Sequence, residues 1–224
     1  MKTRKIQEQF VQGLFNVLKT DGFVIDKTTL TLIDQQKNTT TIATWVNRYG
    51  MAASLGFWIA RRYDQIETIV EKYISDVYPT PGRKPFAFTL RFNENDLNGK
   101  HNAGAGYLFD GAEENVGKFI GQVVPIMQNK LIPFLEKLRS YEALHEFIND
   151  PPEKYLNNAY FFSKDGMTPF RKMIIAKIVN KDYDTVCHWV LTDMIERLKP
   201  DSAEKYETYK KIYFELKKEL DERQ

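Results

Sequence analysis

The sequence predicts an α+β fold: an antiparallel sheet of four or five strands packed with helices, followed by a helical C-terminal region. The clearest strand is residues 86–93, where apolar and other residues alternate, as they do when a strand buries one face. Three earlier extended segments are joined by short connections, which is typical of antiparallel neighbours. From residue 112 onward the apolar residues follow helical spacing. We therefore expect a sheet domain over residues 1–150 and a helical region over 151–224 packed on it.

The first predicted element is a helix over residues 4–19. Its apolar residues recur three or four positions apart and so share one face: Ile6, Phe10, Leu14 and Val17. Gly22 suits a left-handed helix end. The three extended segments then follow over 23–33, 39–49 and 50–62, and Tyr49-Gly50 marks a tight turn between the last two.

The later helices are predicted from apolar stripes and prolines. Pro125 and Pro133 must kink or divide a helical stretch, because proline interrupts helical hydrogen bonding. The last helix carries a seam with spacings of three and four, formed by Tyr206, Tyr209, Tyr213, Leu216 and Leu220. This seam is too short for an independent coiled coil, so we expect the protein's own helices to bury it. The helices are expected over 64–77, 113–139, 140–148, 169–180, 183–198 and 202–221.

Composition favours a globular protein of ordinary type. The 224 residues are 42% apolar and 28% charged, enough to bury a core without disulfides. The net charge is +2, so no global field favours nucleic acid or an anionic membrane. The one cysteine, Cys187, is compatible with a reducing compartment, and no segment approaches the roughly 18 apolar residues of a membrane helix. We expect a cytoplasmic protein of bacterial type, without a membrane or nucleic-acid partner.

A glycine-rich loop over residues 99–111 is the closest approach to a phosphate-binding segment. Glycines let backbone amides converge on an anion at a helix N-terminus. Here they precede an apolar triplet, Tyr107-Leu108-Phe109, which is a candidate fifth strand, and the Lys-Ser/Thr ending of nucleotide-binding loops is absent. The loop is either a connection between strands or the site of an alternative function. In that alternative, an enzyme or nucleotide-binding protein uses Lys100, His101 and Asp110 together with Arg91.

The sequence has no recognisable nucleophile or metal motif. Cys187 and His188 are adjacent, and adjacent helical residues point about 100° apart, so they do not form a nucleophile–base pair by themselves. His145 lacks a second ligand at the spacing of helical metal sites. We predict no catalytic residue, no metal and no cofactor.

The polar face of the predicted sheet is the best candidate for a binding site. Carrying the alternation through every strand places the following residues opposite the Phe and Leu core: Thr29, Thr31, Ala43, Trp45, Asn47, Ser54, Trp58, Arg62, Thr89 and Arg91. Trp and Arg are enriched where proteins recognise partners, so Trp45, Trp58, Arg62 and Arg91 are the predicted binding residues. The alternative is that the C-terminal helices cover this face.

The layout of residues 6–148 resembles a bacterial domain-of-unknown-function family. The similarity rests on the opening helix, the Gly22-Phe23 step into the first strand, the three-strand meander and the helix around Ile132-Pro133-Phe134-Leu135-Glu136-Lys137-Leu138. The resemblance implies an α+β fold without known catalytic residues. It also implies an accessory or immunity-like role of the kind encoded near toxins.

Together these patterns predict a non-catalytic interaction protein, immunity-like, that recognises a protein partner through the sheet face. Convergence distinguishes this prediction from the enzyme alternative. An enzyme needs its polar groups gathered in one pocket, whereas a binding protein presents a flat or concave aromatic surface.

Overall fold

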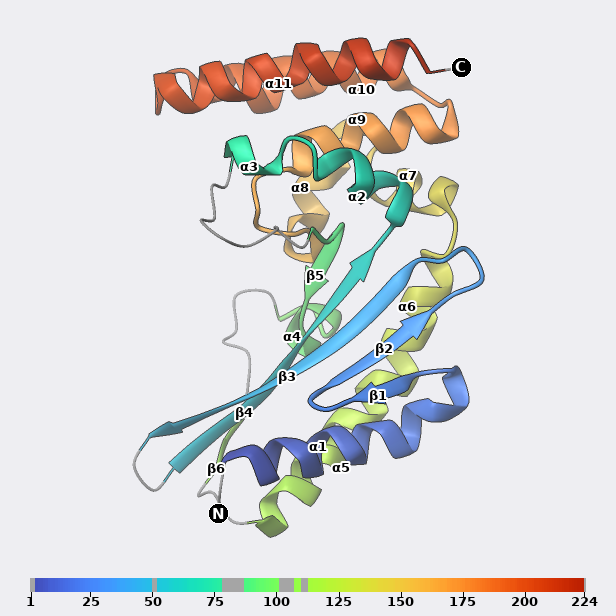
Figure 1. Ribbon diagram of the computed structural model, residues 1–224, viewed down its shortest axis with the longest axis vertical. Helices are drawn as coiled ribbons and strands as arrows, with labels where there is room; N and C mark the ends of the chain where they lie inside the picture. The colour runs from blue at the N-terminus through green and yellow to red at the C-terminus, as the bar shows by residue number, and fades with distance from the viewer. Residues whose placement is uncertain (1–2, 50–51, 78–86, 101–106, 110–112, 224) are drawn as a thin grey trace. The chain divides into compact units, whose positions relative to one another are not determined.

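The computed structural model describes residues 3–49, 52–77, 87–100, 107–109 and 113–223 (Figure 1). It confirms the α+β class, with an antiparallel sheet and a helical C-terminal region. Among the described residues, no helix is both long enough and apolar enough to cross a membrane.

The chain divides into two compact units, which differ from the division expected at residue 150. Unit 1 comprises residues 1–62 and 90–137, and unit 2 comprises residues 63–89 and 138–224. The segments 63–89 and 138–150 therefore group with the C-terminal helices. Buried hydrogen bonds that join residues far apart in the sequence, such as Glu67 to Arg171, explain this grouping.

Unit 1 is built on a six-stranded antiparallel sheet. The strands are β1 (Val24–Asp26), β2 (Thr29–Ile33), β3 (Thr39–Tyr49), β4 (Ala52–Arg62), β5 (Leu90–Phe92) and β6 (Tyr107–Phe109). The order is β1-β2-β3-β4-β5, and β6 pairs with β4. Because β3 occupies one edge of β4, β5 and β6 follow one another along the other edge.

The sheet has one strand more than the upper number expected, because one expected strand is divided in two. The segment expected as one strand over 23–33 is a hairpin of β1 and β2. Its turn places Lys27 in the left-handed region at a φ of 52°, and the Thr29 hydroxyl donates to the Asp26 carbonyl at 2.9 Å. The apolar triplet at 107–109 also forms the predicted extra strand, β6.

Strand β5 is shorter than the strand expected over 86–93, and the placement of Thr89 on the polar sheet face is wrong. Thr89 precedes β5 and is fully buried. Its hydroxyl donates to a Glu67 carboxylate oxygen at 2.6 Å. Because this acceptor is buried, Thr89 does not follow the alternation of buried and exposed residues expected for the strand.

The helices of unit 1 are α1 (Thr3–Leu18), α4 (Glu94–Leu97), α5 (Glu113–Ile126) and α6 (Ile132–Lys137). A π-helical turn over Met127–Leu131 separates α5 from α6, and it lies between the two prolines that predict a division there. The core joins helices to the sheet through aromatic rings. The Phe10 ring of α1 lies 6.0 Å from Phe57 of β4 and 4.9 Å from Phe119 of α5, between ring centroids.

Unit 2 is helical. Its helices are α2 (Asp64–Val70), α3 (Ile74–Val77), α7 (Tyr141–Ile148), α8 (Tyr155–Asn158), α9 (Thr168–Val179), α10 (Tyr183–Trp189) and α11 (Ala203–Asp221). A π-helical turn over Val190–Ile195 continues α10. Helix α9 contacts α2, α7, α10 and α11, and its first nine residues are all buried. It is therefore the central helix of this unit.

The C-terminal helix is docked as its seam predicts. All five seam residues, Tyr206, Tyr209, Tyr213, Leu216 and Leu220, are buried. The Tyr209 hydroxyl donates to the Gly166 carbonyl at 3.0 Å, and the Tyr213 hydroxyl donates to the Cys187 carbonyl at 3.2 Å. The seam thus combines apolar packing with hydrogen bonds that satisfy its buried phenol groups.

Candidate functional site

The register of the sheet places the four predicted binding residues on one face of unit 1. Directly opposed residues of antiparallel strands point to the same side, and side chains alternate along each strand. The opposed pairs are Ala43 with Trp58, Gly56 with Trp45, Thr39 with Arg62, and Ala60 with Arg91. These pairs share one side, which we call the Trp/Arg face after Trp45, Trp58, Arg62 and Arg91.

Helices of unit 1 pack on the opposite face. Helix α1 contacts that face through Phe10 and Phe57, and its Gln7 amide donates to the Thr44 carbonyl at 2.6 Å. Helix α6 reaches the same face where the Phe134 ring lies 5.2 Å from the Phe92 ring, between centroids. The sheet therefore separates an aromatic core from the Trp/Arg face.

Cationic and aromatic groups touch one another on the Trp/Arg face. The Arg91 guanidinium carbon lies 5.0 Å from the centroid of the Trp58 ring, within cation–π range. Arg91 is exposed, whereas Trp45, Trp58 and Arg62 are partly exposed. Neither tryptophan is fully buried, so both rings present area to an approaching group. A guanidinium held over an indole offers a carboxylate or an aromatic side chain a planar, preoriented contact.

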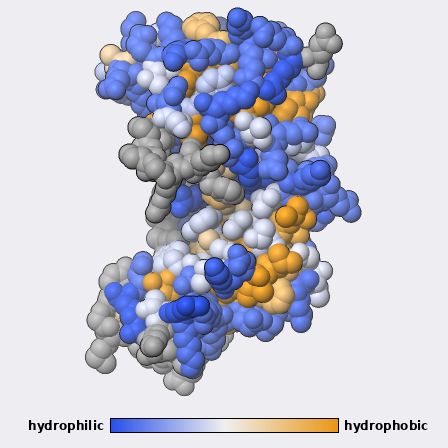
Figure 2. Space-filling model, in the orientation of Figure 1, coloured by the Kyte–Doolittle hydropathy of each residue, from blue (hydrophilic) through white to orange (hydrophobic). Residues whose placement is uncertain are grey.

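Apolar side chains extend the same face toward the edge of the sheet. Val24 of β1 lies opposite Thr31 of β2, and Ile33 of β2 lies opposite Thr39 of β3. Thr39 in turn lies opposite Arg62 of β4, so Val24 and Ile33 share the Trp/Arg face. Val24 is 61% exposed and Ile33 is 65% exposed, although both are aliphatic. Figure 2 shows apolar groups interrupting the hydrophilic surface near the β1–β2 hairpin. Exposed aliphatic side chains grouped in this way are typical of an interaction surface.

The glycine-rich loop contributes little that the structure describes. His101 and Asp110 lie outside the described residues, whereas Lys100 is exposed and its backbone amide donates to the Asn95 carbonyl at 2.8 Å. The segment before it is α4, a single turn closed by a capping box between Asn93 and Asp96. The alternative loop site of Lys100, His101 and Asp110 stays a prediction.

Cys187 and His145 are both buried within unit 2. Burial raises the pKa of the Cys187 thiol to about 11, so the thiol is protonated at neutral pH, and neighbouring His188 is exposed. Burial also lowers the pKa of His145, whose Nδ1 lies 3.2 Å from the Asn149 amide nitrogen. Within the described parts of the chain, no group of three or more His, Cys, Asp or Glu side chains is arranged to hold a metal ion.

A buried charge cluster in unit 2 is the largest feature that the sequence patterns did not identify. Arg171 of α9 is fully buried and bonds Glu67 at 2.8 and 2.9 Å and Asp165 at 2.6 and 2.7 Å. Burial opposes the charge of Arg171, but the two carboxylates raise its pKa. Burial likewise opposes ionisation of Asp165, and Arg171 lowers the pKa of that carboxyl overall. Each guanidinium nitrogen of Arg171 donates to a carboxylate of unit 2, so the cluster stabilises this unit.

A second cation of α9 lies beside the cluster in sequence but has different partners. The Lys172 amine donates to the carbonyls of Ile148 and Pro152, both at 2.8 Å, and lies 4.8 Å from the centroid of the Trp189 ring. Burial lowers the pKa of Lys172 to about 7, while the charge of Glu153 acts in the opposite direction. Arg171 and Lys172 lie between apolar residues of α9, Pro169-Phe170 before them and Met173–Ala176 after them, and this position within an apolar stretch is the sequence signal that could have identified them.

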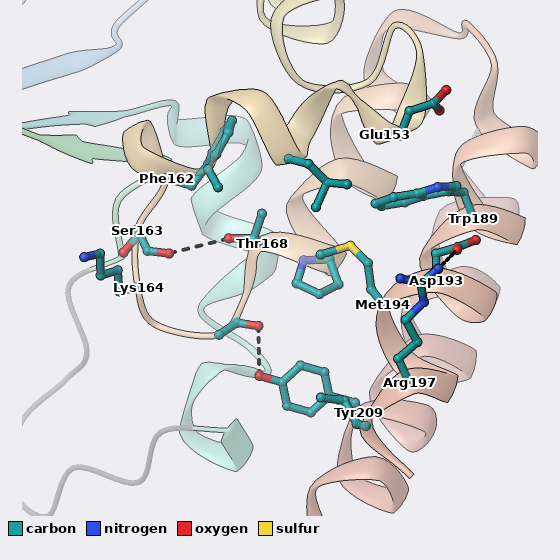
Figure 3. Close-up of a pocket in the computed structure, with 15 residues that line it drawn as sticks. Glu153, Phe162, Ser163, Lys164, Thr168, Trp189, Asp193, Met194, Arg197 and Tyr209 are labelled. Carbon is teal, nitrogen blue, oxygen red and sulfur yellow. Dashed lines mark hydrogen bonds and ion pairs between the residues drawn. The ribbon is translucent and has the colours of Figure 1, made fainter. Parts of the chain in front are cut away.

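Unit 2 also contains a pocket of about 520 Å³ (Figure 3). Its apolar walls include Phe162, Pro169, Trp189 and Met194. On the side of Trp189, the Arg197 guanidinium is paired with the Asp193 carboxylate at 2.6 Å. The residues that line the pocket come from the segment 153–169, from the end of α10 and the turns after it, and from α11. Because these segments are far apart in the sequence, no local motif predicts the pocket.

No protein-family model, curated protein or solved structure matches the chain. The resemblance to a bacterial domain-of-unknown-function family therefore stays a prediction.

Proposed function

We propose that this protein is a non-catalytic interaction protein that binds a protein partner through the Trp/Arg face. The observation that supports the proposal is the placement of two tryptophans and two arginines on the sheet face opposite α1 and α6. Trp and Arg dominate the binding energy of many protein interfaces because they combine large contact area with directional polar groups.

The surroundings of these residues favour a protein partner over a small ligand or nucleic acid. Threonines and alanines between the large side chains keep the face shallow, and Val24 and Ile33 add exposed aliphatic area at its edge. A net charge of +2 gives no strong long-range attraction for polyanions. A partner with apolar side chains and carboxylates fits this mixture, and the immunity-like role implied by the family resemblance is one setting for such a partner.

The proposal is tested by affinity capture with matched variants. The full chain, Trp58→Ala and Ile33→Ser are compared with Phe214→Ala, which removes an exposed aromatic side chain (53% exposed) from α11 in unit 2. We expect a partner captured by the full chain and by Phe214→Ala to be lost with Trp58→Ala. With the purified partner, Trp58→Ala should weaken binding by more than about 2 kcal/mol, roughly thirtyfold in Kd.

Folding must be measured on the same variants. The melting temperature of Trp58→Ala should stay close to that of the full chain, because the ring is only partly buried. Equal partner affinity for Trp58→Ala and Phe214→Ala would contradict the proposal. So would a loss of binding that accompanies unfolding of Trp58→Ala while Ile33→Ser, which folds, binds normally.

A further inference from the structure

Apolar and polar side chains both line the pocket of unit 2. Trp189 forms one wall, and Phe162, Pro169 and Met194 line the space beside it (Figure 3). Its volume of about 520 Å³ lies within the usual range of small-molecule sites, about 300 to 1,000 Å³. At the rim, Leu156 is 63% exposed, an apolar side chain that a bound molecule would shield from water.

Most polar groups around the pocket already have partners inside the protein. The Thr168 hydroxyl donates to the Ser163 carbonyl, and the Tyr209 hydroxyl donates to the Gly166 carbonyl (Figure 3). A ligand therefore does not need to satisfy these groups, and its body is expected to be apolar. A flat ring is the shape that uses an indole wall best.

Charged side chains of both signs line the pocket: Glu153 and Asp193 are acidic, and Lys164 and Arg197 are basic. The Lys172 amine lies 4.8 Å from the indole centroid, and because Lys172 does not line the pocket, it contacts the ring from outside. Burial lowers the pKa of Lys172 to about 7, and its protonated form reduces the attraction of this π-system for a second cation. The Trp189 wall is therefore better suited to a neutral aromatic ring than to a cationic group.

Arg197 supplies a place for an acidic group. It follows Trp189 and Asp193 at intervals of four residues, and all three line the pocket on the same side (Figure 3). Its ion pair with Asp193 engages one guanidinium nitrogen, Nη2. A guanidinium has five N–H donors in a planar fork, so Arg197 retains donors for a second carboxylate.

We infer that this pocket binds a flat apolar acid of the aromatic carboxylate class, with its ring against Trp189 and its carboxylate on Arg197. The site lies within unit 2 and is separate from the Trp/Arg face of unit 1. Pairing with Asp193 neutralises part of the Arg197 charge, so the apolar body supplies most of the affinity and the carboxylate supplies the selection for an acid.

The test uses 2-naphthoate as the probe and isothermal titration calorimetry on the full chain. Two compounds with the same ring are the controls: 2-naphthalenemethanol, which is neutral, and 2-naphthylmethylamine, which is cationic. We expect the acid to bind at least about tenfold more tightly than the alcohol, the worth of one charge-assisted hydrogen bond. The amine should bind most weakly. Equal affinity of acid and alcohol overturns the anion assignment, and no heat from any of the three at millimolar concentration overturns the site.

Two variants locate the bound acid. Arg197→Gln removes the proposed carboxylate contact from an exposed side chain, and Arg223→Gln removes another exposed arginine of unit 2 that is also in an ion pair one helical turn away. We expect Arg197→Gln to reduce the affinity for 2-naphthoate about tenfold and leave the alcohol unchanged, whereas Arg223→Gln changes neither. Equal effects of the two variants would show nonspecific attraction and overturn the assignment to Arg197.

A tryptophan readout tests the aromatic wall independently. The chain has three tryptophans, so Trp45→Phe combined with Trp58→Phe leaves Trp189 as the only indole. Indole fluorescence of this variant should change on adding 2-naphthoate with the same Kd as the calorimetric titration. An unchanged signal at saturation would place the acid away from Trp189 and overturn the inference.

Discussion

The Trp/Arg face of unit 1 and the central helix of unit 2 place their cations in opposite ways. Unit 1 carries Arg62 and Arg91 on a sheet face, whereas unit 2 buries Arg171 and Lys172 in its central helix. A strand has two sides, and when helices cover one, the other is open to charged and aromatic residues. Helix α9 is contacted from several directions, so its cations must find partners inside the unit. Burial rather than the type of element decides how an arginine is used: Arg61, on the helix-covered face of the same sheet, is also buried and pairs with Asp34 at 2.6 Å.

The largest expected effect is the loss of the buried pairing in unit 2. Arg171→Met should lower the free energy of unfolding by about 3 to 5 kcal/mol, because it leaves the buried Glu67 carboxylate without its cation. Arg62→Met is the matched change in unit 1 and should cost less than about 1 kcal/mol, since Arg62 is partly exposed. Urea unfolding of the two variants measures both quantities.

Adding Glu67→Gln to Arg171→Met sharpens the comparison. Removing both charges should recover part of the lost stability, because the uncompensated carboxylate is what makes the single change costly. If Arg62→Met and Arg171→Met lower the free energy of unfolding by the same amount, the proposed difference between a partly exposed and a buried arginine is wrong.

An effect of intermediate size is a pH dependence that belongs to unit 2. The pKa of Lys172 is about 7 in the folded protein and near 10.5 when the chain is unfolded, so above pH 7 the unfolded state binds more protons at this site. Stability should therefore rise with pH, by on the order of 2 kcal/mol between pH 7 and pH 9 from this group alone. Below pH 7 both states are protonated and the contribution becomes flat.

The matched variants for this dependence are Lys172→Met and Lys177→Met in the same helix. The increase in unfolding free energy between pH 7 and pH 9 should disappear in Lys172→Met and persist in Lys177→Met, whose side chain is only partly buried. An increase that survives in Lys172→Met would assign the titration to another group.

The sheet face was predictable because its pattern is local. Trp58 and Arg62 lie on the same side of one strand simply because they are four residues apart, and the period-2 rule needs no knowledge of the rest of the fold. Arg91 joins them through register, which follows from short antiparallel connections and the apolar residues on the other face. The rule failed at Thr89, because a hydrogen bond to Glu67, 22 residues earlier, outweighs the alternation.

The features of unit 2 were not predictable because they depend on long-range pairing. Arg171 and Glu67 are 104 residues apart, and neither has a local pattern that names the other. The helix periods locate α9 correctly, but the partner of a buried cation is set by which helices surround it. The pocket has the same origin, since its lining residues come from 153–169, from 189–198 and from Tyr209 of α11.

The smallest expected effect tests whether the Trp/Arg face is preorganised. Arg91 lies 5.0 Å over the Trp58 ring, and an exposed cation–π contact is worth about 0.5 to 1 kcal/mol. A double-mutant cycle of Arg91→Ala and Trp58→Leu in urea unfolding should give a coupling free energy in that range. The single changes should each cost little, because the contact lies at the surface and replaces hydration on both groups. In partner binding the same cycle should give a larger coupling, since the partner removes water from the pair. A coupling of zero in both measurements would mean that the two side chains act separately, and the face would then be a set of independent contacts.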